Sequence, residues 1–197
     1  MTSSVAFVPD TAFLHADDVP GKIKGTPERL PDGERPLPRF CGAAYEQTDH
    51  ITGRATFRLR YTSAGAPAES TPKAEVYQEI LVYRETASEA FMTALRAAVT
   101  GCASQNDEAG VPVANIMRGD VGAGAESALI EQTRPATDEK GNPVGDGSTQ
   151  SKFCAVVRVG DAIAFLAVLG WESTSADRGD AVALGRKAAE RLAAWKH

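Results

Sequence analysis

Histidine, cysteine and aromatic residues are scarce in this chain of 197 residues, which has three histidines, three cysteines and 7% aromatic residues. The wide spacing of Cys41, Cys102 and Cys154 excludes a zinc site of clustered cysteines and a CxxC redox pair. They are either buried free thiols, or one disulfide with one thiol left over. Long apolar runs are also missing. The longest, residues 162–170, is shorter than the ~20 residues that cross a bilayer and suits a buried strand.

Recognisable catalytic and cofactor motifs are absent as well. The sequence contains neither G-x-S-x-G nor H-E-x-x-H. The glycine-rich residues 119–124 precede Ala125 and Glu126 instead of the Lys-Ser/Thr pair of a phosphate-binding loop, which favours a surface loop. An EF-hand loop counted from Asp138 would have Pro143 in place of glycine, which favours a solvated turn, with weak calcium binding of another kind as the alternative. We therefore predict no catalytic residue, no metal site and no cofactor, and a non-enzymatic role is favoured.

The composition is that of a globular protein: 43% of the residues are hydrophobic, the formal net charge is −5 and the pI is about 5.3. An acidic chain is a poor match for nucleic acid, so the expected partner is a small molecule or a protein. Residues 1–4 lack the basic and apolar regions of a secretory leader. Two interpretations remain: a cytoplasmic protein, or a trimmed sequence from an exported protein of the cell envelope or extracellular space.

Periodicity predicts one α+β domain over residues 41–197, preceded by a proline-rich N-terminal arm over residues 1–40. About five to six strands should pair in a mainly antiparallel sheet, with two amphipathic helices packed on it. The strands are expected at residues 54–61, 75–84, 113–118, 127–133, 152–159 and 162–171, and the helices at residues 86–101 and 177–195. Thr86 and Glu89 have the spacing of a capping box at the start of the first helix.

Three arginines share one face of the first predicted strand: Arg54, Arg58 and Arg60. Guanidinium groups repel one another unless anions lie nearby, and they match carboxylates and phosphates in geometry. Glu75 and Glu79 on the next strand could balance them, which would make this an ordinary charge-compensated surface. The alternative is a site for an anionic ligand or partner at Arg54, Arg58 and Arg60.

The order and content of these segments resemble the PknH-like extracellular sensor domains and related secreted lipoproteins of actinobacteria. The resemblance covers roughly residues 74–196. It rests on the helix from Glu85 to Cys102, the strand at residues 153–158, the apolar strand at 163–170 and the alanine-rich helix at 181–194. The arm, at residues 12–21 and 37–41, is similar to the N-terminal part of the lipoproteins. Two features depart from the family: Val99 lies about where a tryptophan often precedes the helix cysteine, and three cysteines replace the usual four.

The resemblance implies an antiparallel sheet flanked by helices, export, tethering to a membrane through an upstream segment, and a ligand-sensing role. It also implies a Cys102–Cys154 disulfide, with Cys41 as the unpaired cysteine. Three hypotheses on function follow. The first is a non-enzymatic ligand-binding or sensor-type domain. The second is a cytosolic enzyme or accessory protein with a pocket between sheet and helices, and the third is an interaction domain that uses its sheet edge or its arm.

Overall fold

The computed structural model describes residues 6–19, 22–25, 27–31, 34, 37–63, 67, 72, 74–138, 142–171 and 174–196. The strands are β1 (Lys22–Lys24), β2 (Pro27–Leu30), β3 (Ile51–Ser63), β4 (Ala74–Tyr83), β5 (Ser104–Asn106), β6 (Pro112–Met117), β7 (Glu126–Pro135), β8 (Thr149–Val159) and β9 (Ala162–Gly170). The α-helices are α1 (Ala87–Gly101) and α2 (Arg178–Lys196). Three short 3-10 turns cover Asp10–Ala12, Ala16–Asp18 and Thr48–His50.

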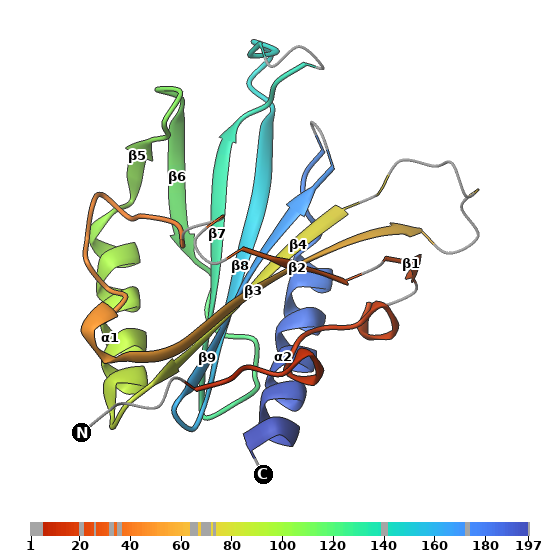
Figure 1. Ribbon diagram of the computed structural model, residues 1–197. Helices are drawn as coiled ribbons and strands as arrows, with labels where there is room; N and C mark the ends of the chain where they lie inside the picture. The colour runs from red at the N-terminus through yellow and green to blue at the C-terminus, as the bar shows by residue number, and fades with distance from the viewer. Residues whose placement is uncertain are drawn as a thin grey trace.

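One antiparallel sheet organises the molecule, in the order β1-β3-β4-β9-β8-β7-β6-β5, with β2 also pairing with β3 (Figure 1). Each face of the sheet is covered by one α-helix. On one face, α2 and the N-terminal residues 8–19 pack on the apolar side chains of the central strands. On the other face, α1 and residues 37–45 pack on the opposite side chains of the same strands. The α+β class and the antiparallel sheet are therefore confirmed.

Alternation of side chains explains why the long strands were predictable. Phe57, Leu59 and Tyr61 of β3 are buried on the α2 side, as their period of two requires. The number of strands was underestimated, because β1, β2 and β5 have only three or four residues each, too few for a pattern of apolar residues to be recognised. These segments become strands through pairing with a longer neighbour. Pro20 and Gly21, and parts of the predicted loops at 62–73 and 138–148, lie outside the described residues.

The predicted arm contributes to the sheet, because β1 and β2 both pair with β3. Phe13 stacks on Phe57 with ring centroids 4.0 Å apart, and Asp18 forms an ion pair with Arg191 of α2 at 3.0 Å. These contacts attach the N-terminal residues to both the sheet and α2. The division of the chain into an arm and a domain at residue 40 stays a prediction.

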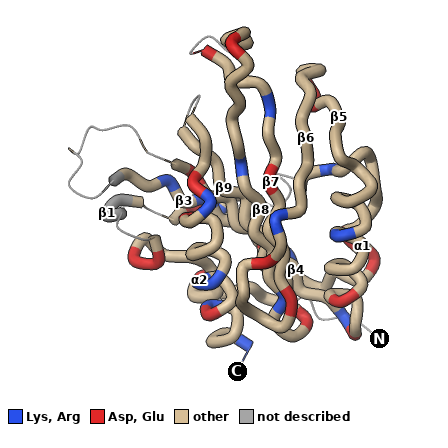
Figure 2. The backbone as a smooth tube through the Cα atoms, turned by 180° about the vertical axis from the view of Figure 1, so that it is seen from behind, with Lys and Arg blue, Asp and Glu red and all other residues tan. Residues whose placement is uncertain are grey.

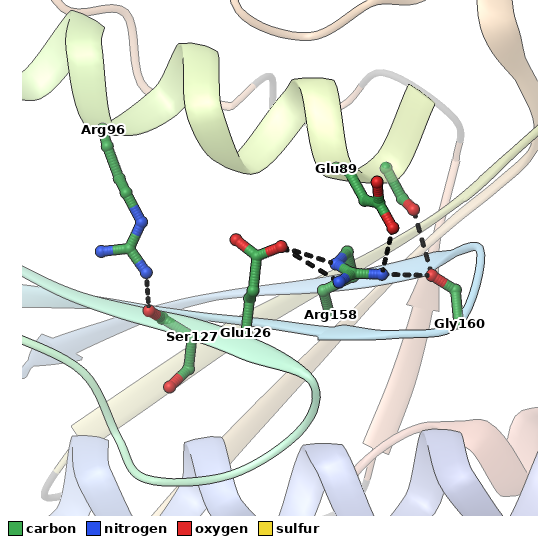
Figure 3. Close-up of polar contacts among 7 residues, drawn as sticks. Glu89, Arg96, Glu126, Ser127, Arg158 and Gly160 are labelled. Carbon is green, nitrogen blue, oxygen red and sulfur yellow. Dashed lines mark hydrogen bonds and ion pairs between the residues drawn. The ribbon is translucent and has the colours of Figure 1, made fainter. Parts of the chain in front are cut away.

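Helix α1 is fixed to the sheet by polar contacts near its N-terminal end (Figure 3). Arg158 of β8 forms ion pairs with Glu126 of β7 at 3.0 Å and with Glu89 of α1 at 3.5 Å. Arg96, about two turns further along α1, donates to the carbonyl of Ser127. The predicted capping box does not form. The Thr86 side chain makes no capping hydrogen bond, and Glu89 forms an ion pair with Arg158 instead.

None of the described helices combines the length and the apolar character that a membrane span requires. Figure 2 shows acidic and basic residues interspersed over the same elements.

Candidate functional site

A cleft lies on the α1 side of the sheet, beyond the area that α1 covers. Three adjoining hollows form it, and all three are lined by Gln132 of β7 and Lys152 of β8. These two residues are directly opposite each other in the β7–β8 ladder. We call the combined space the α1-side cleft; its other lining residues used below are Leu37, Pro38, Arg39, Cys41, Thr56, Tyr77, Glu79, Gln105, Asp107, Glu108, Arg134, Cys154, Phe165 and Ala167.

The floor of the cleft combines apolar and polar side chains from neighbouring strands. Phe165 and Ala167 of β9 provide apolar surface, together with Leu37 and Pro38 from the segment that crosses the sheet. This innermost hollow has a volume of about 120 Å³. A mostly apolar hollow with a few converging polar groups is the common form of a small-molecule site.

A chain of side-chain amides sets the orientation of Gln132. The Gln132 Nε2 donates to Asn115 Oδ1 at 2.6 Å, and Asn115 Nδ2 donates to the carbonyl of Cys102 at 2.9 Å. The Gln132 Oε1 is buried and accepts no hydrogen bond from any described residue, although the residue is only 3% exposed. One N–H of the amide is engaged with Asn115, which leaves Gln132 Oε1 as an unsatisfied acceptor of a residue that lines the cleft.

A second unsatisfied polar atom lies at the β3 side of the cleft. Thr56 is 2% exposed, and its Oγ1 has no hydrogen-bond partner among the described residues. Buried polar groups are normally hydrogen-bonded, because desolvation without a partner is costly. Two such groups lining one cleft are the strongest sign of a ligand site in the described part of the chain.

Lys152 supplies a positive charge at the centre of the cleft. Within the described ranges it forms no ion pair, whereas Arg54 and Arg158 on the same side of the sheet are each paired with two carboxylates. Acidic and basic residues also lie at the rim, including Arg39, Arg134, Asp107 and Glu108. The carboxylate of Asp107 accepts backbone hydrogen bonds from Ala109 and Val111.

The three arginines singled out in the sequence lie on β3 next to this cleft. Arg54 forms ion pairs with Glu79 at 2.8 Å and with Glu46 at 2.9 Å. Arg58 forms an ion pair with Glu28, and this hydrogen bond is the main cause that raises the pKa of Arg58 above its ordinary value.

Arg60 lies 3.6 Å from Glu75 and stacks over the ring of Trp171 at 5.3 Å. The balancing role predicted for Glu75 and Glu79 is thus present in the structure, together with further partners at Glu46 and Glu28. Whether Arg54, Arg58 and Arg60 also bind a ligand stays a prediction.

The cysteine pairing implied by the family resemblance is wrong. The disulfide joins Cys41 to Cys102, while Cys154 is buried and takes part in no disulfide among the described residues. Cys154 lies in mid-strand on β8, and β7 separates it from Asn115 of β6, which contacts Cys102.

The disulfide forms part of the wall of the cleft. Cys41 lines its outer part, and the Cys41 backbone N–H donates to Gln105 Oε1 at 2.6 Å. Gln105 Nε2 in turn donates to the carbonyl of Arg39 at 2.6 Å. The disulfide and one glutamine side chain therefore hold residues 39–41 against β5, next to the C-terminal end of α1.

Tyr45 anchors the other end of this wall. Its hydroxyl donates to the carbonyl of Pro38 at 2.5 Å, and its ring meets Phe91 of α1 edge-on at 5.5 Å. Burial, with the nearby Cys154 and Glu46, raises the pKa of Tyr45 far above its ordinary value, so the hydroxyl stays protonated. The wall segment is thus fixed at both ends, which gives the cleft a defined shape.

Sequence reasoning missed the cleft residues Gln132 and Lys152, because nothing in their local sequence distinguishes them from other polar strand residues. The described residues contain no cluster of three histidine, cysteine or acidic side chains that could hold a metal ion. What the arrangement can do is bind: it offers an acceptor, a hydroxyl, a cation and an apolar surface within one cleft.

No protein-family model matches the chain, and no curated protein sequence matches it. Among solved structures, the extracellular domain of PknH from Mycobacterium tuberculosis is similar, with a TM-score of 0.59 and 13% sequence identity. The similarity covers 93% of this chain and 93% of that chain. The expected resemblance to a PknH-like domain is therefore confirmed at the level of the fold.

Proposed function

We propose that this chain is a non-enzymatic ligand-binding or sensor-type domain whose ligand occupies the α1-side cleft. The observation that carries the proposal is the pair of buried, unsatisfied polar atoms, Gln132 Oε1 and Thr56 Oγ1, that belong to residues lining the cleft. A ligand that hydrogen-bonds to both would remove a desolvation cost that the free protein bears.

The protein is proposed to act outside the cytoplasm, as the soluble part of an exported protein that is tethered to a membrane. Support comes from the Cys41–Cys102 disulfide, since such bonds persist mainly in oxidising compartments. The fold shared with the extracellular domain of PknH agrees with this location. The partner is proposed to be a small molecule or a peptide rather than nucleic acid, and an anionic one would suit Lys152.

A fragment library screened by NMR against the ¹⁵N-labelled protein tests the site. We expect the compounds that bind to shift resonances of the cleft, such as those of Gln132 and Phe165. Lys152→Met should weaken binding of anionic compounds about tenfold or more, because it removes the central cation. The matched control is Lys187→Met, since Lys187 lies on α2, which covers the opposite face, and is paired with Glu190. Compounds that bind only elsewhere, or equally well to both variants, would contradict the proposal.

The arginines of β3 are tested in the same assay. Charge reversal of Arg58 and Arg60 should weaken an anionic ligand if they extend the site. Unchanged affinity in the double variant would reject these arginines as ligand-binding residues and leave the cleft itself unaffected.

A further inference from the structure

We infer that the ligand of the α1-side cleft is a small organic acid with an N–H or O–H donor. The donor atom lies one or two bonds from the carbon that bears the carboxylate. The inference rests on the proposed function and specifies its ligand. It depends on the geometry of four residues: Asn115, Gln132, Lys152 and Phe165.

The acceptor at Gln132 defines the first part of the ligand. An isolated glutamine side chain could offer either its N–H₂ or its oxygen to a ligand. Here Asn115 is itself fixed by donating to the Cys102 carbonyl, so its Oδ1 receives the Gln132 Nε2 at 2.6 Å. One of the two Gln132 N–H groups is thereby engaged, whereas the Gln132 Oε1 has no partner among the described residues. A hydrogen-bond donor on the ligand would satisfy this oxygen. Asn115 is a positioning residue, because it holds the Gln132 amide in this orientation.

The cation at Lys152 defines the second part. Lys152 lines all three hollows of the cleft and forms no ion pair within the described part of the chain. Its cross-strand partner is Gln132, and such partners have Cβ atoms roughly 5 Å apart. One compact ligand can therefore reach both side chains, provided that its anionic group and its donor are separated by only a few bonds. An α-amido acid or an α-hydroxy acid meets this requirement.

The apolar hollow defines the third part. Phe165 and Ala167 lie beside Cys154 on the same face, and Leu37 and Pro38 close this hollow, whose volume is about 120 Å³. Transfer of a branched aliphatic group from water to such a surface is favourable, at about 25 cal/mol for each Å² buried. The expected ligand therefore carries an aliphatic substituent on the carbon next to its carboxylate.

A matched set of probes tests the inference on the full chain. N-acetyl-leucine has the carboxylate, the N–H donor and the aliphatic group. N-acetyl-leucinamide lacks the negative charge, and N-acetyl-N-methyl-leucine lacks the donor. We expect N-acetyl-leucine to shift the cleft resonances of the ¹⁵N-labelled protein, and each of the other two to bind about tenfold more weakly. Replacement of N-acetyl-leucine by 2-hydroxy-4-methylpentanoate shows whether an amide or a hydroxyl is the preferred donor.

Two variants show which residue causes each difference in affinity between the probes. In Lys152→Met, the acid and the amide should bind equally, while the penalty for N-methylation remains. In Gln132→Met, the N-methylation penalty should disappear, while the preference for the acid remains. Lys187→Met should change neither. If Gln132→Met does not fold, the comparison of the three probes on the unaltered protein still decides the matter.

The inference is overturned if N-acetyl-leucine binds no better than its amide and its N-methyl form, or if neither it nor the hydroxy acid shifts the cleft resonances. When other fragments bind in the cleft, such a result rejects the ligand class and keeps the proposed function. When no fragment shifts the cleft resonances, the proposed function fails as well.

Discussion

At the scale of single residues, Thr56 illustrates how a proposed binding site can oppose stability. Its hydroxyl is buried without a partner, so folding removes that group from water with no hydrogen bond in return. We predict that Thr56→Val raises the free energy of unfolding by about 1 kcal/mol, because valine has a similar shape and no polar group to desolvate. Urea denaturation followed by circular dichroism measures the difference.

Thr52 on the same strand is the matched control. Its Oγ1 donates to the carbonyl of Val82 at 3.2 Å, so Thr52→Val should lower the free energy of unfolding by about 1 kcal/mol. An equal decrease in the free energy of unfolding at the two positions would show that the Thr56 hydroxyl is hydrogen-bonded in the free protein. That result would weaken the assignment of the cleft as a ligand site.

The pairing of the cysteines shows where prediction at this scale fails. Cysteine spacing leaves every pairing open, and the family resemblance selected Cys102–Cys154. The pairing actually depends on where residues 37–45 cross the sheet, which places Cys41 beside the end of α1. No local pattern around Cys41 reports this crossing, because it is a tertiary contact over 61 residues of chain.

At the scale of elements, the disulfide joins the wall of the cleft to the end of α1. A covalent loop of this size restricts the unfolded chain, and the chain-entropy relation gives about 4 kcal/mol. We predict that the double variant Cys41→Ser/Cys102→Ser lowers the free energy of unfolding by about this amount. Reduction of the unaltered protein by dithiothreitol should have a similar effect in the same urea titration.

Cys154→Ala provides the control for the pairing. It removes a thiol that is 1% exposed and forms no disulfide, so the effect of dithiothreitol should persist in this variant. The effect should be absent from the double variant. Loss of the dithiothreitol effect in Cys154→Ala would instead mean that Cys154 takes part in the disulfide.

Long elements were predictable and short ones were not, for a physical reason. The strands β3, β4, β7, β8 and β9 have nine residues or more, so each is visible in the sequence, as an alternation of apolar residues in β3 and as a continuous apolar run in β9. The three residues of β5 are all polar, and β2 begins with a proline. Such edge segments are strands only because a neighbour supplies hydrogen-bond partners.

At the scale of the whole molecule, the cleft is a product of sheet order. Thr56, Lys152 and Gln132 lie on β3, β8 and β7, and Thr56 is more than seventy residues away from the other two in the sequence. The order β3-β4-β9-β8-β7-β6 aligns them on one face. The polar face of β3 could be predicted from the sequence. Its place beside a cleft could not, because that depends on the order of the strands in the sheet.

Buried tyrosines make the stability of the whole molecule sensitive to alkaline pH. Burial is the main cause that raises the pKa of Tyr45, Tyr61 and Tyr83 above the ordinary value, and nearby carboxylates act in the same direction. Above pH ~10 the unfolded chain loses these protons while the folded chain keeps them. The free energy of unfolding should therefore fall as the pH rises, by up to about 1.4 kcal/mol per pH unit for each tyrosine.

Tyr61→Phe tests this linkage at one position. The Tyr61 hydroxyl donates to Asp180 of α2 at 3.3 Å, so the variant should lose about 1 kcal/mol at neutral pH, where the tyrosine is protonated in both states. Above pH ~10 its free energy of unfolding should fall less steeply than that of the unaltered protein, because one titrating group is missing. The two curves should therefore converge with rising pH in urea titrations. Parallel curves would mean that Tyr61 ionises equally in the folded and unfolded states, and that its contact with Asp180 does not keep it protonated.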